Sequence, residues 1–356
     1  MIAFLGRRDI PTDGVEEYCK HLREALKKNG YELKLARVPW TELGWIRALG
    51  WLWRESGDRQ GQWTLVQYTA LSWSRHGFSL RFLAVLWVLR KRRARLAVVF
   101  HDAEPYRGTR AVDRIRRACQ LWVMRTSYRW AHRSIVTVPL VGIPFLPPNP
   151  TKAAVVPVGA NIPATSQNGD RKTSRSKTVA VFGVTGGGTV GTEIADIAYC
   201  MDQVSRRFER PQLVLMGRGS REAEGRLRQA LNGAPVDIVA LGLLPPEAVS
   251  RTLQTSDALL FVRGPISTKK GSAIAGIACG LPVVGYSGPH TGPPLTNAGV
   301  MLAPEGDPQK LSEALIRVLG EEQLWQELHR RSLNAQQRHF SWSAVAERLM
   351  SVLSDE

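Results

Sequence analysis

The sequence has 356 residues, of which 44% are hydrophobic, so it can build two cores of ordinary domain size. Its four cysteines lie far apart with no CxxC pair, which excludes a disulfide framework and a cysteine zinc site and favours reduced thiols in the cytoplasm. The longest apolar run, Phe78 to Leu89, contains Arg81 and is too short to span a bilayer.

Positive charge and tryptophan are concentrated in the first half of the chain, whose total net charge is +17. Residues 1–160 hold 27 Lys and Arg against 12 Asp and Glu, and nine of the eleven tryptophans. This combination suits the inner, anionic face of a membrane, where indoles lie at headgroup depth and cations meet phosphate. A basic face with aromatic side chains also suits nucleic acid, but we recognise no nucleic-acid-binding module in the sequence.

Short apolar runs alternate with helical patterns along the first half. MIAFLG meets charge at Arg7 and predicts a strand rather than a signal peptide. A helix is predicted over Val15–Asn29, with Lys27 and Lys28 in its last turn. The strands are predicted at Ile2–Gly6, Glu32–Val38, Thr64–Tyr68, Leu96–His101, Ser134–Val138 and Ala153–Val158.

The second half repeats this alternation after a polar stretch, residues 161–177, that predicts a linker. Its strands are predicted within KTVAVFGV, QLVLMGRG, VDIVALG, DALLFVR, LPVVGYS and GVMLAP, and the chain closes with helices. The pattern predicts an α/β protein with two doubly wound, Rossmann-like domains, 1–160 and 178–338, followed by a terminal segment, 339–356.

The order of several motifs resembles the retaining glycosyltransferases of family 4. These motifs are DGVEEYCKHL, VVFHD, VPVGANIP, LVLMGRG, the stretch from VDIVALG to DALLFV, IACGLPVVGYSG and FSWSAVAERLMSVL. The resemblance implies the GT-B fold, with two domains facing a cleft. It also implies that the acceptor binds mainly to the first domain and the nucleotide-sugar to the second, and that the last helix crosses back to the first.

Two glycine-containing turns are candidates for binding the donor. Gly14 lies just before a helix, where backbone amides can approach a diphosphate, although Asp13 stands where the family often has glycine; a plain strand-to-helix turn is the alternative. The family places an Arg and a Lys in the loop after the first strand of the second domain. This chain has no cation between Thr178 and Ser205 but a glycine-rich loop with Gly183, Thr185, Gly186 and Gly187.

The loop before GLPVV departs from the family in the opposite way. The family has two glutamates there, for sugar and ribose, at the positions of Ser267 and Ala275. Between them lie Lys269 and Lys270, then Gly271 and Ser272 at a predicted helix start, where cations are favourable only beside an anion. We hypothesise that the phosphate clamp has moved to this loop, as in a subgroup with an S-x-K/R-K/R-G-S sequence. The alternative is that the lysines are solvated.

Three further residues end strands at the same predicted edge. Arg218 and Arg263 are additional candidates for contacting the donor phosphates. His101 matches the family histidine that contacts the donor sugar, whereas a lone strand-end histidine is more often structural. The resemblance implies that departing phosphate accepts the acceptor's proton, so no side-chain base is assigned.

These features predict a glycosyltransferase that uses a nucleotide diphosphate sugar and a saccharide or lipid-linked acceptor, with retention implied by the resemblance. We expect no cofactor and no metal, because no DxD-like carboxylate cluster is present. The enzyme is expected in the cytoplasm, with possible peripheral attachment to the membrane. Two alternatives stay open: an inactive binding or scaffold protein derived from the fold, since both glutamates are missing, and, as the weaker one, a nucleic-acid-binding protein.

Overall fold

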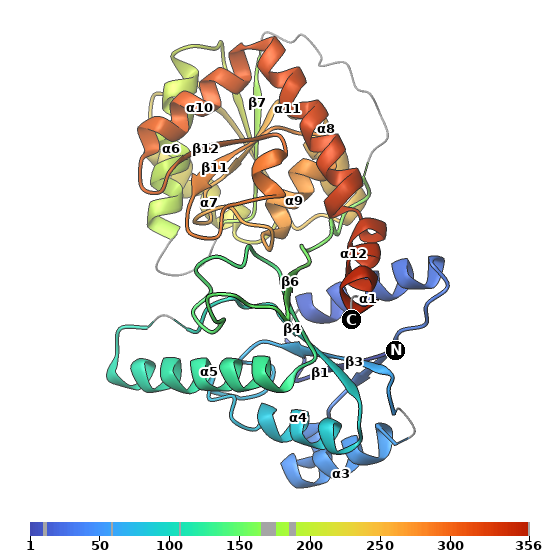
Figure 1. Cartoon of the computed structure of the whole chain (residues 1–356). Coiled ribbons are helices and arrows are strands. Elements are labelled where there is room, and N and C mark those ends of the chain that lie inside the picture. The colour runs from blue at the N-terminus through green and yellow to red at the C-terminus, as the bar shows by residue number, and fades with distance from the viewer. Residues whose placement is uncertain (10–12, 58–59, 107, 165–175, 185–189, 355–356) are drawn as a thin grey trace. The chain divides into compact units, whose positions relative to one another are not determined.

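A computed structural model describes residues 1–9, 13–57, 60–106, 108–164, 176–184 and 190–354 (Figure 1). The chain divides into two compact units, one formed by Met1–Pro157 with Trp342–Glu356 and the other by Val158–Ser341. Thr185, Gly186, Gly187 and most of the predicted linker lie outside the described residues.

The first unit is built on a parallel sheet with strand order β2-β1-β3-β4-β5-β6. Every predicted strand of the first half is present. The strands are β1 (Ile2–Leu5), β2 (Lys34–Arg37), β3 (Trp63–Tyr68), β4 (Arg95–Phe100), β5 (Arg133–Val136) and β6 (Ala153–Val155). The helices are α1 (Gly14–Lys28), α2 (Trp40–Leu43), α3 (Trp45–Glu55), α4 (Phe82–Lys91), α5 (Ala111–Trp130) and α12 (Trp342–Ser354).

The second unit has a parallel sheet of order β12-β11-β10-β7-β8-β9. Its strands are β7 (Thr178–Phe182), β8 (Gln212–Met216), β9 (Asp237–Gly242), β10 (Ala258–Phe261), β11 (Val283–Ser287) and β12 (Val300–Pro304). Its α-helices are α6 (Val190–Ser205), α7 (Ser220–Ala230), α8 (Pro246–Gln254), α9 (Gly271–Ala278), α10 (Pro308–Gly320) and α11 (Glu322–Ala335). A 3-10 turn spans Leu295–Asn297 and a π-helical turn spans Gln336–Phe340.

Both faces of the second sheet are buried, which explains why its strands are almost continuously apolar. Leu213 and Leu215 of β8 enter the core beneath α6, α7 and α10, whereas Val214 and Met216 enter the core beneath α8 and α9. Alternate side chains of a strand point to opposite faces, so only an apolar run can satisfy two covered faces. The doubly wound architecture is thereby confirmed.

The terminal helix α12 belongs to the first unit, as expected. Trp342 stacks on His21 of α1 with ring centroids 5.2 Å apart, and it meets Tyr18 edge-on at 5.3 Å. Near the other end of α12, the Val352 carbonyl accepts a hydrogen bond from Arg133 Nε at 3.0 Å. These contacts fix α12 beside α1 (Figure 1).

Candidate functional site

The carboxyl ends of three neighbouring strands form the candidate donor site of the second unit. β10, β7 and β8 are adjacent and parallel, so the residues that follow them meet at one edge. The Gly183 amide after β7 donates to the Met216 carbonyl at 2.7 Å, and the Val184 amide donates to the Arg218 carbonyl at 3.0 Å. Sheet topology therefore brings the predicted residues Gly183, Arg218 and Arg263 to the same edge.

Gly183 is favoured at its position by its backbone conformation, and it lies close to Arg263. Its φ is +81°, which side-chain-bearing residues rarely adopt. A Cβ on Gly183 would lie 3.1 Å from Nη1 of Arg263. The Arg263 guanidinium thus lies against the backbone at the start of the glycine-rich loop.

Lys270 lies beside Arg263, in surroundings that disfavour its positive charge. Its Nζ donates a hydrogen bond to the Arg263 carbonyl at 3.1 Å. Burial, and then the positive charges of Lys269 and Arg263, lower the pKa of Lys270, while the carboxylate of Glu193 on α6 opposes this shift. Three cations gathered at one sheet edge favour an anion between them.

Helix α9 begins within this cationic group. Lys270 is its N-cap and provides no side-chain cap, and the described residues offer no acceptor for the amides of Gly271 and Ser272. The Ser267 side chain is only 3% exposed, and its Oγ has no hydrogen-bond partner in the described part of the chain. The predicted loop residues therefore converge on a helix start that has free donors, which is a favourable place for phosphate oxygens.

Ala275 lies too deep to take part in this group. It is 2% exposed and packs in the core between α9 and the sheet, together with Leu259 and Ile277. Glu193 and Asp196, which we did not single out from the sequence, are buried carboxylic acids on α6, and burial raises the pKa of Asp196. Their spacing of three residues, which places both on one face of the helix, was the available signal.

His101 follows β4 in the first unit and is held as a neutral imidazole. Its Nε2 lies 2.7 Å from Oε1 of Gln67 on the adjacent strand β3, and Tyr18 meets the ring edge-on at 5.1 Å. Burial lowers the pKa of His101 to about 4, against a smaller opposing effect of Asp13. A neutral imidazole both donates and accepts hydrogen bonds, which suits contact with sugar hydroxyls.

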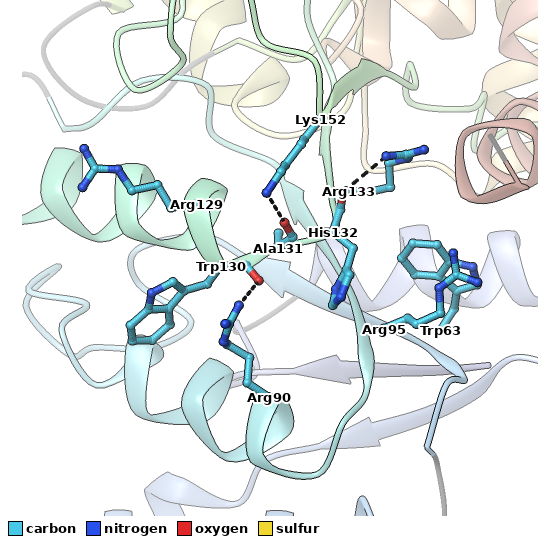
Figure 2. Close-up of a pocket in the computed structure, with 9 residues that line it drawn as sticks. All are labelled: Trp63, Arg90, Arg95, Arg129, Trp130, Ala131, His132, Arg133 and Lys152. Atoms are coloured by element: carbon cyan, nitrogen blue, oxygen red, sulfur yellow. Dashed lines mark hydrogen bonds between the residues drawn. The ribbon is translucent and has the colours of Figure 1, made fainter. Parts of the chain in front are cut away.

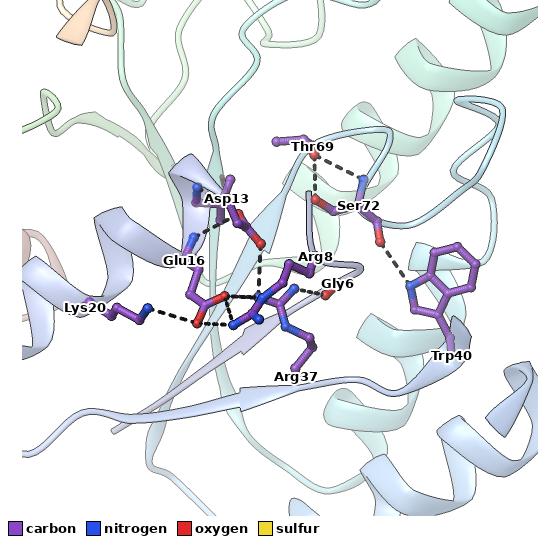
Figure 3. Close-up of polar contacts among 10 residues, drawn as sticks. Gly6, Arg8, Asp13, Glu16, Lys20, Arg37, Trp40, Thr69 and Ser72 are labelled. Atoms are coloured by element: carbon purple, nitrogen blue, oxygen red, sulfur yellow. Dashed lines mark hydrogen bonds and ion pairs between the residues drawn. The ribbon is translucent and has the colours of Figure 1, made fainter. Parts of the chain in front are cut away.

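The turn at Gly14 differs from the expectation for a diphosphate site. Asp13 caps α1, because its Oδ1 accepts from the amides of Val15 and Glu16 at 3.1 and 3.0 Å. Its Oδ2 pairs with Arg37 at 3.0 Å, and Glu16 pairs with Arg37 at 2.8 Å (Figure 3). A phosphate at Gly14 would have to displace this carboxylate, so we leave Gly14 out of the proposed donor site.

The described residues form neither a metal-binding cluster nor a membrane-spanning helix. No group of three or more His, Cys, Asp or Glu residues suited to a metal ion occurs in the part of the chain that the structure describes. Among the helices of that same part, none combines the length and hydropathy needed to cross a bilayer.

Comparisons with known proteins agree with this architecture. Residues 185–321 match the family model described as glycosyl transferases group 1. A comparison with curated protein sequences found no match. Sucrose-phosphate synthase from Thermosynechococcus elongatus shares the fold with a TM-score of 0.67 and 17% identity, over 99% of this chain and 98% of that one.

Two other solved structures share the fold along the whole chain. Anabaena HepE, in complex with UDP and glucose, has a TM-score of 0.65 and 13% identity, over 100% of this chain and 99% of that one. WaaG, a glycosyltransferase involved in lipopolysaccharide biosynthesis, has a TM-score of 0.60 and 12% identity, over 100% of both chains. The match to the group 1 glycosyltransferase model thus lies within the second unit, and the GT-B fold is shared along the whole chain.

Proposed function

We propose that this protein transfers a hexose from a nucleotide diphosphate sugar to a saccharide or lipid-linked saccharide, with retention of anomeric configuration. The observation that carries this proposal is the cationic edge formed by Lys269, Lys270 and Arg263 at the uncapped start of α9. The solved structures of HepE with UDP and with UDP-glucose support testing UDP-glucose first.

The proposed role of the cationic edge is to stabilise the leaving nucleoside diphosphate. The bond between the anomeric carbon and the diphosphate breaks, and the acceptor oxygen bonds to that carbon. The acceptor's proton goes to the departing phosphate. Negative charge grows on the phosphate as the bond breaks, so lysines and free amides held at fixed positions stabilise the transition state more than the ground state.

The loop from Ser267 to Ser272 is proposed to replace the usual phosphate clamp, as in the S-x-K/R-K/R-G-S subgroup. Arg263 supports this relocation, because its guanidinium lies against Gly183 while its carbonyl binds Lys270. Arg218 is a further candidate at the same edge. For His101 we propose the sugar-contacting role that the resemblance implies.

The test compares two double variants that remove the same charge from the second unit. Lys269→Ala with Lys270→Ala removes the proposed clamp, and Arg226→Ala with Arg330→Ala removes two exposed cations elsewhere. Thermal shifts are measured with UDP-, GDP-, ADP- and dTDP-sugars, because a ligand that binds the folded state raises the melting temperature. Nucleotide release is measured with saccharide acceptors.

We expect one donor to stabilise the wild type and the control but not the clamp variant, whose turnover falls by about 100-fold or more. Unchanged donor binding and turnover in the clamp variant would refute the relocation. Tight donor binding without turnover in the wild type would instead favour the binding-protein alternative.

We further propose peripheral attachment of the first unit to an anionic membrane surface, which would give access to a lipid-linked acceptor. Ile46 is 90% exposed on α3, and Trp87 is 51% exposed on α4 with Lys91 5.7 Å from its ring. Exposed apolar side chains beside cations are typical of interfacial helices. Ile46→Ser with Trp87→Ser should reduce sedimentation with anionic vesicles, and equal sedimentation of variant and wild type would contradict attachment through these helices.

A further inference from the structure

A basic cavity lies at the amino ends of the strands of the first unit. Its volume is about 270 Å³. Trp63, Arg95 and Arg133 each begin a strand, namely β3, β4 and β5. Because these strands are parallel, this edge is opposite the edge where His101 follows β4. The complete lining is Trp63, Arg90, Arg95, Arg129, Trp130, Ala131, His132, Arg133 and Lys152 (Figure 2).

The lining carries five cationic side chains and no carboxylate. Arg90, Arg129, Arg133 and Lys152 form no ion pair with any acidic residue among those that the structure describes. Elsewhere in the same unit, cations such as Arg37 and Arg116 do pair with carboxylates. The charges of these four side chains are therefore not balanced by acidic partners, unlike those of Arg37 and Arg116.

Backbone carbonyls at the end of α5 and in α12 hold three of these cations in place. Arg90 Nη1 donates to the Trp130 carbonyl at 2.8 Å, and Lys152 Nζ lies 3.5 Å from the Ala131 carbonyl. Arg133 Nε donates to the Val352 carbonyl at 3.0 Å. Arg133 Nη1 also lies 3.5 Å from the His132 carbonyl. Carbonyls carry only a partial charge and engage one or two N–H groups of each cation, so further donors and the formal charge are left for a ligand.

The aromatic residues and the histidine complete a surface suited to an anion. Arg95 lies 4.5 Å from the centre of the Trp63 ring and Arg90 lies 5.9 Å from that of Trp130, which orients both guanidinium groups. Nδ1 of His132 accepts a hydrogen bond from the Leu96 amide at 3.0 Å, so the proton of the neutral ring is on Nε2.

Four of the positive charges of the cavity act on the pKa of His132. Burial lowers the pKa of His132, and the charges of Arg90, Arg95, Lys152 and Arg133 lower it further. Helix dipoles explain some of these cations, since Arg90 and Arg129 lie in the last turns of α4 and α5. They do not explain Arg95, Arg133 and Lys152, which begin or precede strands.

We propose that this cavity binds a phosphate-bearing anion, at a site separate from the donor site. Arginine and lysine are the side chains that recognise phosphate, by paired hydrogen bonds and by charge. The ligand is either a soluble phosphate compound or the phosphate of a lipid headgroup. The proposal does not rest on the cationic edge of the second unit.

The experiment removes two exposed cations of the cavity that do not anchor α12. The cavity variant carries Arg129→Gln and Lys152→Gln together. The control variant carries Lys27→Gln and Lys28→Gln, which removes equal charge from the end of α1. Both are made in the full chain carrying Lys269→Ala and Lys270→Ala, so that the second unit contributes little anion binding. Circular dichroism checks that both variants are folded. One arm titrates sodium pyrophosphate by calorimetry, and the other measures sedimentation with phosphatidylcholine vesicles with and without phosphatidate.

We expect the cavity variant to bind pyrophosphate about tenfold more weakly than the control. Equal pyrophosphate binding combined with loss of sedimentation on phosphatidate vesicles alone would assign the site to a lipid headgroup. Equal behaviour of the two variants in both arms would overturn the proposal.

Discussion

The buried His101 predicts a definite loss of stability of the first unit at acid pH. Burial lowers its pKa from an ordinary 6.5 to about 4, so the folded chain excludes a proton that the unfolded chain binds. The folded state is unaffected well above pH 6.5 and loses stability as the pH falls from 6.5 towards 4. From these two pKa values, the free energy of unfolding at pH 5 is lower by about 2 kcal/mol than it is near pH 7.

His101→Gln removes this titration while keeping a polar side chain beside Gln67. Urea unfolding at pH 7 and pH 5 can be followed by tryptophan fluorescence, because ten of the eleven tryptophans belong to the first unit. The wild type should lose about 2 kcal/mol more than the variant between the two pH values. His76→Gln, which removes an exposed imidazole of the same unit, should behave as the wild type. Parallel losses in the wild type and His101→Gln would refute the reasoning.

Three further substitutions test the donor site of the second unit and the turn at Gly14. Arg263→Ala should weaken donor binding about tenfold in calorimetry, with Arg263→Lys intermediate, and equal affinities would exclude a phosphate contact. Gly183→Ala forces a side chain into φ +81° and against Arg263, so it should lower the free energy of unfolding of the second unit by about 1–2 kcal/mol and also weaken donor binding. Asp13→Ala should lower the free energy of unfolding of the first unit by about 1 kcal/mol through loss of the helix cap. Donor affinity should be unchanged in this variant, and a large fall would return Gly14 to the donor site.

The strands of both units could be predicted from the sequence because the signals are local. Runs such as VVFHD and QLVLMGRG are apolar at every buried position, and helical patterns separate them. The alternation of strand and helix also specifies a parallel sheet, since parallel neighbours need a crossover. The boundaries of helices were less predictable: Gly44, with φ +73°, divides α2 from α3, and α11 ends in a π-helical turn.

The candidate sites depended on tertiary structure to different degrees. The sequence identified Lys269, Lys270 and the missing glutamates, because loop and helix start are contiguous in the chain. It could not place Arg263 against Gly183, nor pair Asp13 with Arg37, since both contacts depend on how separate elements pack. The cap that Asp13 forms on α1 is local, because it joins residues two and three positions apart.

The basic cavity was decided by the fold alone. In the sequence, Arg95 belongs to a cationic run after α4, and Arg133 and Lys152 are isolated charges that look like ordinary surface residues. Strand pairing places the starts of β4 and β5 side by side, with Ala97 opposite Arg133, and brings the ends of α4 and α5 to the same edge. Composition therefore determined that the first half is basic. Only the register of a parallel sheet gathered those charges around one cavity, because it aligns residues that no local pattern connects.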